Sequence, residues 1–62
     1  MNTKIKVSWF AKKYNETIFR NGVFDNQSKT WNDKKGNPCL TYFDTLRQGY
    51  RTAVNYQMKE VD

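Results

Sequence analysis

The sequence predicts an all-β (mainly antiparallel) domain, a small and partly open barrel of four to five strands. Three observations predict it. Apolar and basic residues alternate with period two near the N-terminus, two Trp, four Tyr and four Phe are spread along the chain, and short turn-like segments separate short β-favouring runs. With 62 residues there is room for one domain, taken as residues 1–62, and for one small core.

The N-terminal part predicts a β-hairpin. Its first strand alternates the apolar Ile5, Val7 and Trp9 with polar and basic residues, so that one face is apolar and the other basic. The polar residues 12–16 follow as a turn with Asn15 in the left-handed conformation, and residues 17–20 return as the second strand. Asn21-Gly22 is a further turn or bulge signal, after which residues 23–24 either prolong the strand or begin a bend.

The C-terminal part predicts three more strands. Residues 29–32 form a short one, because residues 33–37 have the glycine placement of a hairpin loop, and Pro38 begins the next, which ends at residue 43. The chain turns between Asp44 and Gly49, with one short helical turn near residues 45–47 as an option and a positive φ expected at Gly49. The last strand covers about residues 50–56 with either face inward, and residues 58–62 are expected to fray.

The charge is +5 and uneven. Residues 1–24 contain five cations and one acid, whereas residues 25–62 contain six cations and five acids. A basic N-terminal half indicates an anionic partner, either nucleic acid or an acidic protein surface, because like charge steers association. Solubility alone is the other explanation of the same charge.

Residue types that carry chemistry are scarce. The absence of histidine removes the commonest general base and the commonest transition-metal ligand, so no metal, no cofactor and no enzymatic activity are predicted. Cys39, in an apolar strand, is expected to be a buried structural thiol. The glycines form no phosphate-binding pattern. A single cysteine, no secretory segment after Met1 and no apolar run of about 20 residues predict a cytoplasmic protein with no membrane contact.

Two groups of cations beside aromatic rings are the candidate binding residues. The first lies on the N-terminal hairpin and consists of Lys4, Lys6, Phe10, Lys12, Lys13 and Arg20. The second lies around the last turn and a neighbouring loop and consists of Arg47, Tyr50, Arg51, Trp31, Lys34 and Lys35. A solvated charged surface is the plain alternative for the first group. For Arg51 the alternative is an ion pair with Asp44 that braces the last hairpin.

Two segments carry a resemblance to a known family. Residues 7–16 read VSWFAKKYNE, and residues 39–44 and 49–53 read CLTYFD and GYRTA. They resemble a family of short bacteriophage and prophage proteins with an SH3-like β-barrel, whose members have a basic V-S-F-T-K-K-(D/N)-G hairpin and a closing V-L-T-V-W-D-x-x-x-x-G-W-R-S-F hairpin. The chain departs from that pattern at residues 14–16, in its short middle segment and at Ala53. The resemblance implies an SH3-like barrel and a phage accessory role in the bacterial cytoplasm, and it implies no reaction.

The predicted function is non-enzymatic binding of nucleic acid. RNA or single-stranded DNA is favoured over duplex, because no helix is predicted that could enter a major groove. The alternative is a protein-interaction module that inhibits or modulates a host enzyme. Self-association through an unpaired edge strand is a further option.

Overall fold

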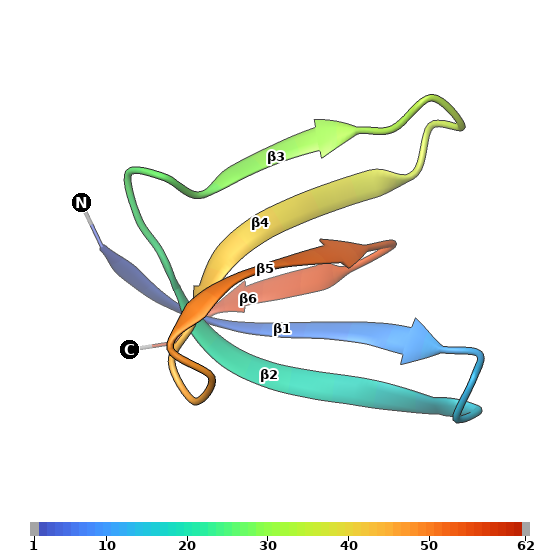
Figure 1. The fold of residues 1–62 in the computed structure, drawn as a ribbon, viewed down its shortest axis with the longest axis horizontal. Coiled ribbons are helices and arrows are strands. Elements are labelled where there is room, and N and C mark those ends of the chain that lie inside the picture. The colour runs from blue at the N-terminus through green and yellow to red at the C-terminus, as the bar shows by residue number, and fades with distance from the viewer. Residues whose placement is uncertain (1, 62) are drawn as a thin grey trace.

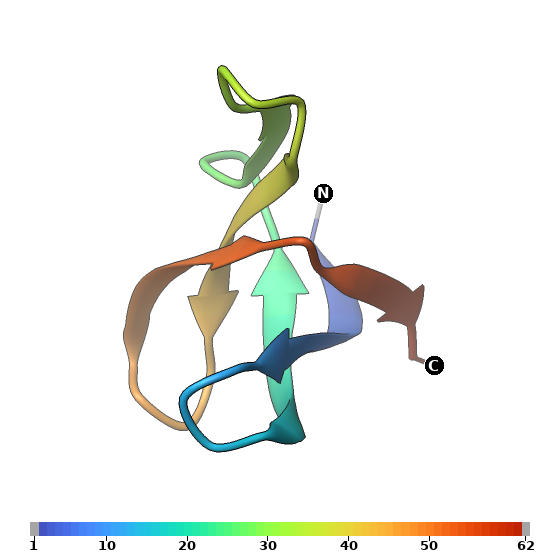
Figure 2. The ribbon, with the colours of Figure 1, turned by 90° about the vertical axis from the view of Figure 1, so that its right-hand side faces the viewer.

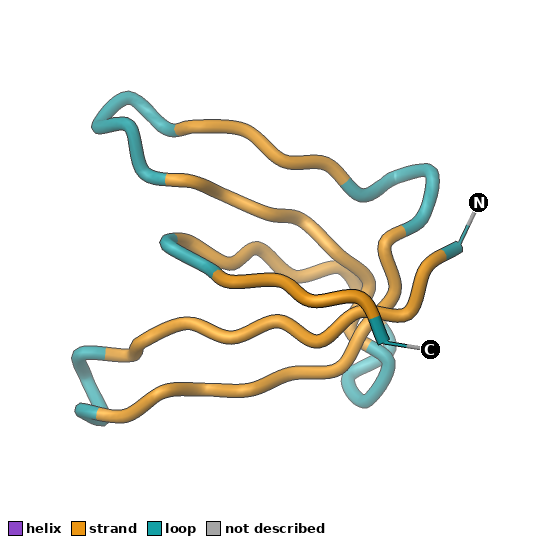
Figure 3. Tube along the Cα trace, turned by 180° about the vertical axis from the view of Figure 1, so that it is seen from behind, coloured by secondary structure: helices purple, strands orange, loops and turns teal. Residues whose placement is uncertain are grey.

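The computed structural model describes residues 2–61, and within that range every regular element is a β-strand (Figure 3). The all-β class is therefore confirmed. Residues 45–48 form a tight turn and not the helical turn that was considered from the sequence. The strands are β1 (Thr3–Ala11), β2 (Glu16–Phe24), β3 (Lys29–Asn32), β4 (Pro38–Asp44), β5 (Gly49–Val54) and β6 (Gln57–Glu60).

All strand pairings are antiparallel, and β4 pairs with three other strands, β2, β3 and β5 (Figure 1). The strand order is β3-β4-β2-β1-β6, and β5 also pairs with β4. The sheet curls on itself, while the β3–β4 hairpin projects from the curled part (Figure 2). This arrangement is the small, partly open barrel that the sequence predicts, with one strand more than expected.

A small core fills the curl. Its buried residues are Ile5, Val7, Leu40, Tyr42 and Ala53, and Trp9, Phe24 and Tyr56 pack against them. The buried residues of β1 are those of the predicted apolar face, so that prediction is confirmed. On β5, Ala53 is the one buried residue. Its face of the strand therefore lies against the core, which settles the face that the sequence left open.

Gly22 lies inside β2, where the sequence left a turn, a bulge or a longer strand open. It pairs with Ile5 on one side and with Asp44 on the other. A Cβ atom at this position would lie 2.5 Å from the carbonyl oxygen of Phe43 and 2.6 Å from the ring of Tyr42. Glycine is therefore present because β2 and β4 approach closely, which is a tertiary requirement and not a turn requirement.

Two of the turns follow the prediction and one does not. Asn15 has a φ of 53°, as expected for the first hairpin, and Gly36 has a φ of 84° in the second. In the turn between β4 and β5 the left-handed residue is Gln48, with a φ of 57°, so the assignment to Gly49 was wrong. The reason is that the backbone N–H of Gln48 closes the turn by donating to the carbonyl oxygen of Asp44 at 2.8 Å. Gly49 is then the first residue of β5.

Residues 58–60 do not fray as predicted, because they belong to β6, which pairs with β1, and residue 62 lies outside the described residues. Asn55, with a φ of 55°, ends β5 and redirects the chain. Residues 57–60 then pair with Ile5–Ser8, the free edge of the first hairpin. A strand of four exposed residues carries no burial pattern, which is why sequence periodicity did not reveal it.

Candidate functional site

The outer face of β1, β2 and β6 is basic and carries exposed rings. Since Ile5 and Val7 are buried, the even-numbered residues of β1 point outward. The strand register places Phe19 opposite Ser8 and Lys59 opposite Lys6. We call this surface the lysine face, and it consists of Lys4, Lys6, Phe10, Phe19 and Lys59.

The two rings of the lysine face are neighbours. Phe19 lies opposite Ser8, two residues from Phe10, so Phe10 and Phe19 occupy diagonal positions. Diagonal side chains in an antiparallel pair are about 7–8 Å apart. The rings are 56% and 63% exposed, respectively. Beside Phe19, a shallow groove of about 440 Å³ runs across to β6. The geometry offers two adjacent flat apolar platforms next to a groove.

No described acid pairs with the cations of this face. Lys6 and Lys59 lie directly opposite each other, an arrangement of like charges that costs stability in a sheet. Among residues 2–61 the one ion pair is between Arg47 and Asp44, so neither lysine is neutralised by a described acid. A bound anion would relieve this repulsion.

Phe19 and Lys59 were not among the predicted site residues. The signal for Phe19 was present, because a turn over residues 12–15 sets the register that brings it beside Ser8 and Phe10. Lys59 had no such signal, since it joins the face only through the pairing of β6 with β1.

Arg20 does not lie with Lys4 and Lys6 as predicted. It pairs with Val7, so it shares the core-facing side of β2. Its guanidinium carbon is 5.9 Å from the centre of the Trp9 ring, and Nη1 donates to the carbonyl oxygen of Phe19 at 2.9 Å. The hairpin grouping was wrong for this residue because neighbouring residues of a strand point to opposite faces.

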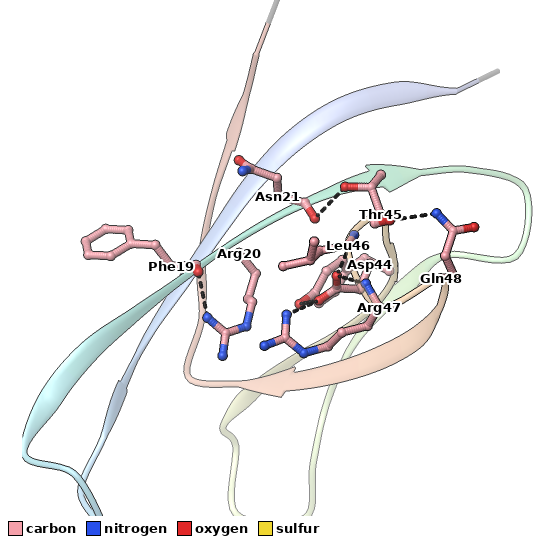
Figure 4. Close-up of polar contacts among 9 residues, drawn as sticks. Phe19, Arg20, Asn21, Asp44, Thr45, Leu46, Arg47 and Gln48 are labelled. Carbon is pink, nitrogen blue, oxygen red and sulfur yellow. Dashed lines mark hydrogen bonds and ion pairs between the residues drawn. The ribbon is translucent and has the colours of Figure 1, made fainter.

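Arg20 instead meets Arg47 at a second basic surface (Figure 4). A pocket of about 360 Å³ lies between β2 and the turn of residues 45–48. Both guanidinium groups point into it, and Leu46, with 82% of its surface exposed, also lines it. We call this site the arginine pocket. Its lining residues are Phe19, Arg20, Asn21, Asp44, Thr45, Leu46 and Arg47.

Asp44 organises the turn beside this pocket. Its buried carboxylate accepts the backbone amides of Leu46 and Arg47 at 3.1 and 3.0 Å, and its Oδ2 pairs with the Arg47 guanidinium at 3.4 Å. The pair considered from the sequence, Arg51 with Asp44, is therefore replaced by Arg47 with Asp44. The Tyr42 hydroxyl also donates to Asp44, at 3.5 Å. Burial, together with the charge of Asp44, raises the pKa of the Tyr42 phenol, while Arg20 and Arg47 act in the opposite direction.

Four of the other predicted cations lie at the hairpin tips. Lys12 and Lys13 occupy the β1–β2 turn, and Lys34 and Lys35 occupy the β3–β4 loop. Both tips are at the end of the molecule opposite the turn of residues 45–48 (Figures 1 and 3). The structure therefore separates the second predicted group into two places.

Two of the remaining candidates lie on the outer side of the sheet. Trp31 is on β3, where its ring has the Lys29 ammonium 5.4 Å from its centre. Tyr50 packs edge-on against Phe43, with ring centroids 5.3 Å apart. Arg51 is on the opposite, core-facing side of β5, where it pairs with Tyr42. Tyr50 and Arg51 therefore both lie near the last turn, as predicted, with their side chains on opposite faces of β5.

Tyr50 holds the loop between β2 and β3 in place through a hydrogen bond. Its hydroxyl donates to Oδ2 of Asp25 at 2.6 Å, and this bond lowers the pKa of Asp25 and raises that of Tyr50. The loop is further held by Ser28, whose hydroxyl accepts the Asp25 amide at 2.9 Å. The ring thus has a structural contact that accounts for its position.

Replacing Tyr50 with phenylalanine should lower the free energy of unfolding in a pH-dependent way. The bond requires an ionised Asp25 and a neutral Tyr50. The contribution of this bond to stability is present above the usual aspartate pKa. It is lost as pH falls through the lowered pKa of Asp25 in the folded protein. The same contribution is present below the usual tyrosine pKa and is lost as pH rises through the raised pKa of Tyr50. The deficit of Tyr50→Phe should therefore be largest between about pH 4 and pH 10.

Urea unfolding across this pH range measures the deficit. Tyr14→Phe is the matched control, because the Tyr14 ring is 62% exposed and no described residue forms a hydrogen bond with its hydroxyl. A Tyr50→Phe deficit that stays constant from acid to alkaline pH would contradict the assignment.

Within residues 2–61, no group of three or more His, Cys, Asp or Glu side chains is arranged to hold a metal ion. Cys39 is a buried free thiol, which confirms its predicted burial. A search of the same residues found no helix with the length and apolar character needed to cross a membrane.

Comparison with protein-family models, with curated proteins and with solved structures found no match to this chain. The case for a function therefore depends on the chemistry of the two basic surfaces.

Proposed function

We propose that this protein is a non-enzymatic module that binds single-stranded nucleic acid, RNA or DNA, on the lysine face. One observation carries the proposal: Phe10 and Phe19 are exposed diagonal neighbours beside Lys6 and Lys59, a pair that no described acid neutralises. Exposed rings among cations are the two elements that sequence-tolerant binding of single strands requires.

The spacing of the rings suits two bases of one strand. A base can stack on each ring, because the rings are exposed and in diagonal positions. The lysines would contact the phosphates between and beside these bases, and each neutralised phosphate would release counterions. A duplex is a poorer ligand, because its bases are already stacked and cannot lie on the rings. No reaction is required of the surface.

The resemblance described above supports a phage-encoded accessory role in the bacterial cytoplasm as part of the proposal. A second candidate is a protein-interaction module that modulates a host enzyme. The observation that favours it is β3, an edge strand whose four residues are all exposed and which can accept a strand from a partner or from a second copy of the chain.

A fluorescence anisotropy titration tests the proposal. The ligands are labelled oligothymidylate and oligouridylate of about 12 nucleotides, within the range that one small barrel covers, and a duplex of the same length. We expect both single strands to bind at least about tenfold more tightly than the duplex, a difference of about 1.4 kcal/mol. Absence of single-strand binding, combined with nuclease-resistant capture of one bacterial protein, would favour the second candidate and overturn the first.

A further inference from the structure

We propose that the arginine pocket is a separate site that binds a phosphate group. This inference goes beyond the proposed function and does not depend on it, because the pocket and the lysine face share none of their cations. The pocket lies between β2 and the turn of residues 45–48, with a guanidinium group contributed by each element (Figure 4).

The described residues do not balance the charge of the pocket. Arg20 and Arg47 both line it, and Asp44 is the one acid among its lining residues. Arg51 adds a third cation nearby. Its Nη1 lies 3.9 Å from where a Cβ of Gly49 would be, and Gly49 pairs directly with Asp44. The lining residues alone leave an excess of one positive charge, and the nearby Arg51 raises the local excess to two.

Asp44 neutralises one of these charges, and its oxygens are already engaged by hydrogen-bond donors. Two backbone amides and the Tyr42 hydroxyl donate to it in addition to the Arg47 guanidinium. A carboxylate stabilised in this way is a fixed structural anion and needs no second arginine. Arg20 is therefore not explained by pairing with Asp44.

Most guanidinium donors of the pocket remain available. A guanidinium has five N–H donors. Among the described residues, Arg20 uses Nη1 for the carbonyl oxygen of Phe19, and Arg47 uses Nη1 for Asp44. Nevertheless both side chains are held in place, Arg20 by the face of the Trp9 ring and Arg47 by its ion pair. Positioned cations with unused donors have the properties of a preorganised anion site.

The turn that carries Arg47 is also fixed. The amide and the hydroxyl of Thr45 both donate to the carbonyl oxygen of Asn21, at 3.3 and 3.2 Å, which ties the turn to β2. The Gln48 side chain donates to the carbonyl oxygen of Thr45 at 2.7 Å (Figure 4). The backbone segments that carry the two guanidinium groups are therefore held together without a ligand, which lowers the ordering cost of binding.

A phosphate monoester fits this pocket better than a carboxylate does. It carries about −1.5 to −2 charges at neutral pH, which matches the local excess of two positive charges when Arg51 is counted, whereas a carboxylate carries one. Its three terminal oxygens point in different directions, as donors from two separate elements require, and guanidinium groups recognise them with paired hydrogen bonds. The source of the group is either the end of a nucleic-acid strand or a free phosphorylated compound.

The first test is an amide NMR titration of the ¹⁵N-labelled chain with sodium phosphate and, at matched ionic strength, with sodium acetate. We expect saturable shifts at the amides of residues 45–48 with phosphate only. Arg20→Gln should weaken this binding at least about tenfold, the loss of one charge-assisted hydrogen bond, and Arg20→Lys should weaken it less. Lys29→Gln removes the same charge on β3 and should leave it unchanged. Linear shifts, equal binding of acetate, or an unaffected Arg20→Gln protein that is folded would overturn the proposal.

The second test identifies the source of the phosphate. Oligothymidylate with a 5′-phosphate is compared with the same strand bearing a 5′-hydroxyl. Tighter binding of the phosphorylated strand, lost in Arg20→Gln, supports the pocket and assigns it to strand ends. Equal binding of the two strands together with saturable inorganic phosphate supports the pocket and assigns it to free phosphorylated compounds. Failure of the lysine face would instead abolish binding of the hydroxyl strand and leave the phosphate shifts intact.

Discussion

Replacing Phe10 and Phe19 together with alanine is expected to weaken binding of oligothymidylate by about 30-fold or more. Stacking of one base on an aromatic side chain is worth about 1–3 kcal/mol, so two rings contribute about 2 kcal/mol at the least. Both rings are more than half exposed, and the double variant should therefore keep the fold. Anisotropy titration at fixed salt measures the affinity, and circular dichroism checks the fold.

Tyr14→Ala is the matched control for this pair. The Tyr14 ring is as exposed as the others, at 62%, but it lies in the hairpin turn beside Lys13 and outside the lysine face. We expect its loss to change the affinity less than twofold. If the double Phe10/Phe19 variant binds as tightly as the unchanged protein, bases do not stack on these two rings.

Gly22→Ala is expected to lower the free energy of unfolding by about 3 kcal/mol, the upper end of the usual cost of overpacking. The added methyl group would meet the Tyr42 ring and the carbonyl oxygen of Phe43. The carbonyl belongs to the backbone of the neighbouring strand, so it cannot rotate away as a side chain can. A domain of this length has roughly 3–9 kcal/mol of stability in total, and the variant should be partly unfolded in mild urea.

Gly49→Ala is the control at a glycine that lacks these constraints. The nearest atom to its added methyl group is the Arg51 guanidinium at 3.9 Å, and its φ is outside the left-handed region. Such a substitution is neutral or stabilises by up to about 1 kcal/mol, because alanine restricts the unfolded chain. Urea denaturation of both variants measures the difference. Equal stability of the two would show that β2 and β4 do not approach as described.

Several parts of the fold were predictable because they depend on local sequence. The alternation around Ile5 and Val7 fixes which face of β1 is buried, and Asn15 is one of the few residues that accept a left-handed turn position. Cys39 follows a strand start at Pro38 and is buried as expected.

Other features depend on contacts between distant segments, and local patterns do not contain them. Gly22 looks like part of a turn signal, yet its role is set by the approach of β4. The sixth strand exists because β1 has a free edge for residues 57–60. The resemblance to the phage family stays a prediction.

The candidate site shows the same division. Lys4, Lys6 and Phe10 were grouped correctly on one face because they belong to one strand with period two. Arg20 was misplaced because a shift of one residue along a strand reverses the face. The arginine pocket could not be predicted, since it joins β2 to a turn 24 residues further along the chain through Thr45 and Asn21.

The salt dependence of oligothymidylate binding tests the central claim most directly. The lysine face has three cations, Lys4, Lys6 and Lys59, and each phosphate that they neutralise releases counterions. For a single strand, three such contacts predict a slope of about −2 in a plot of log affinity against log salt concentration. Lys6→Gln should reduce the magnitude of this slope by about 0.7, because one phosphate contact is lost. A slope near zero, or a slope that Lys6→Gln leaves unchanged, would contradict binding of a strand on the lysine face.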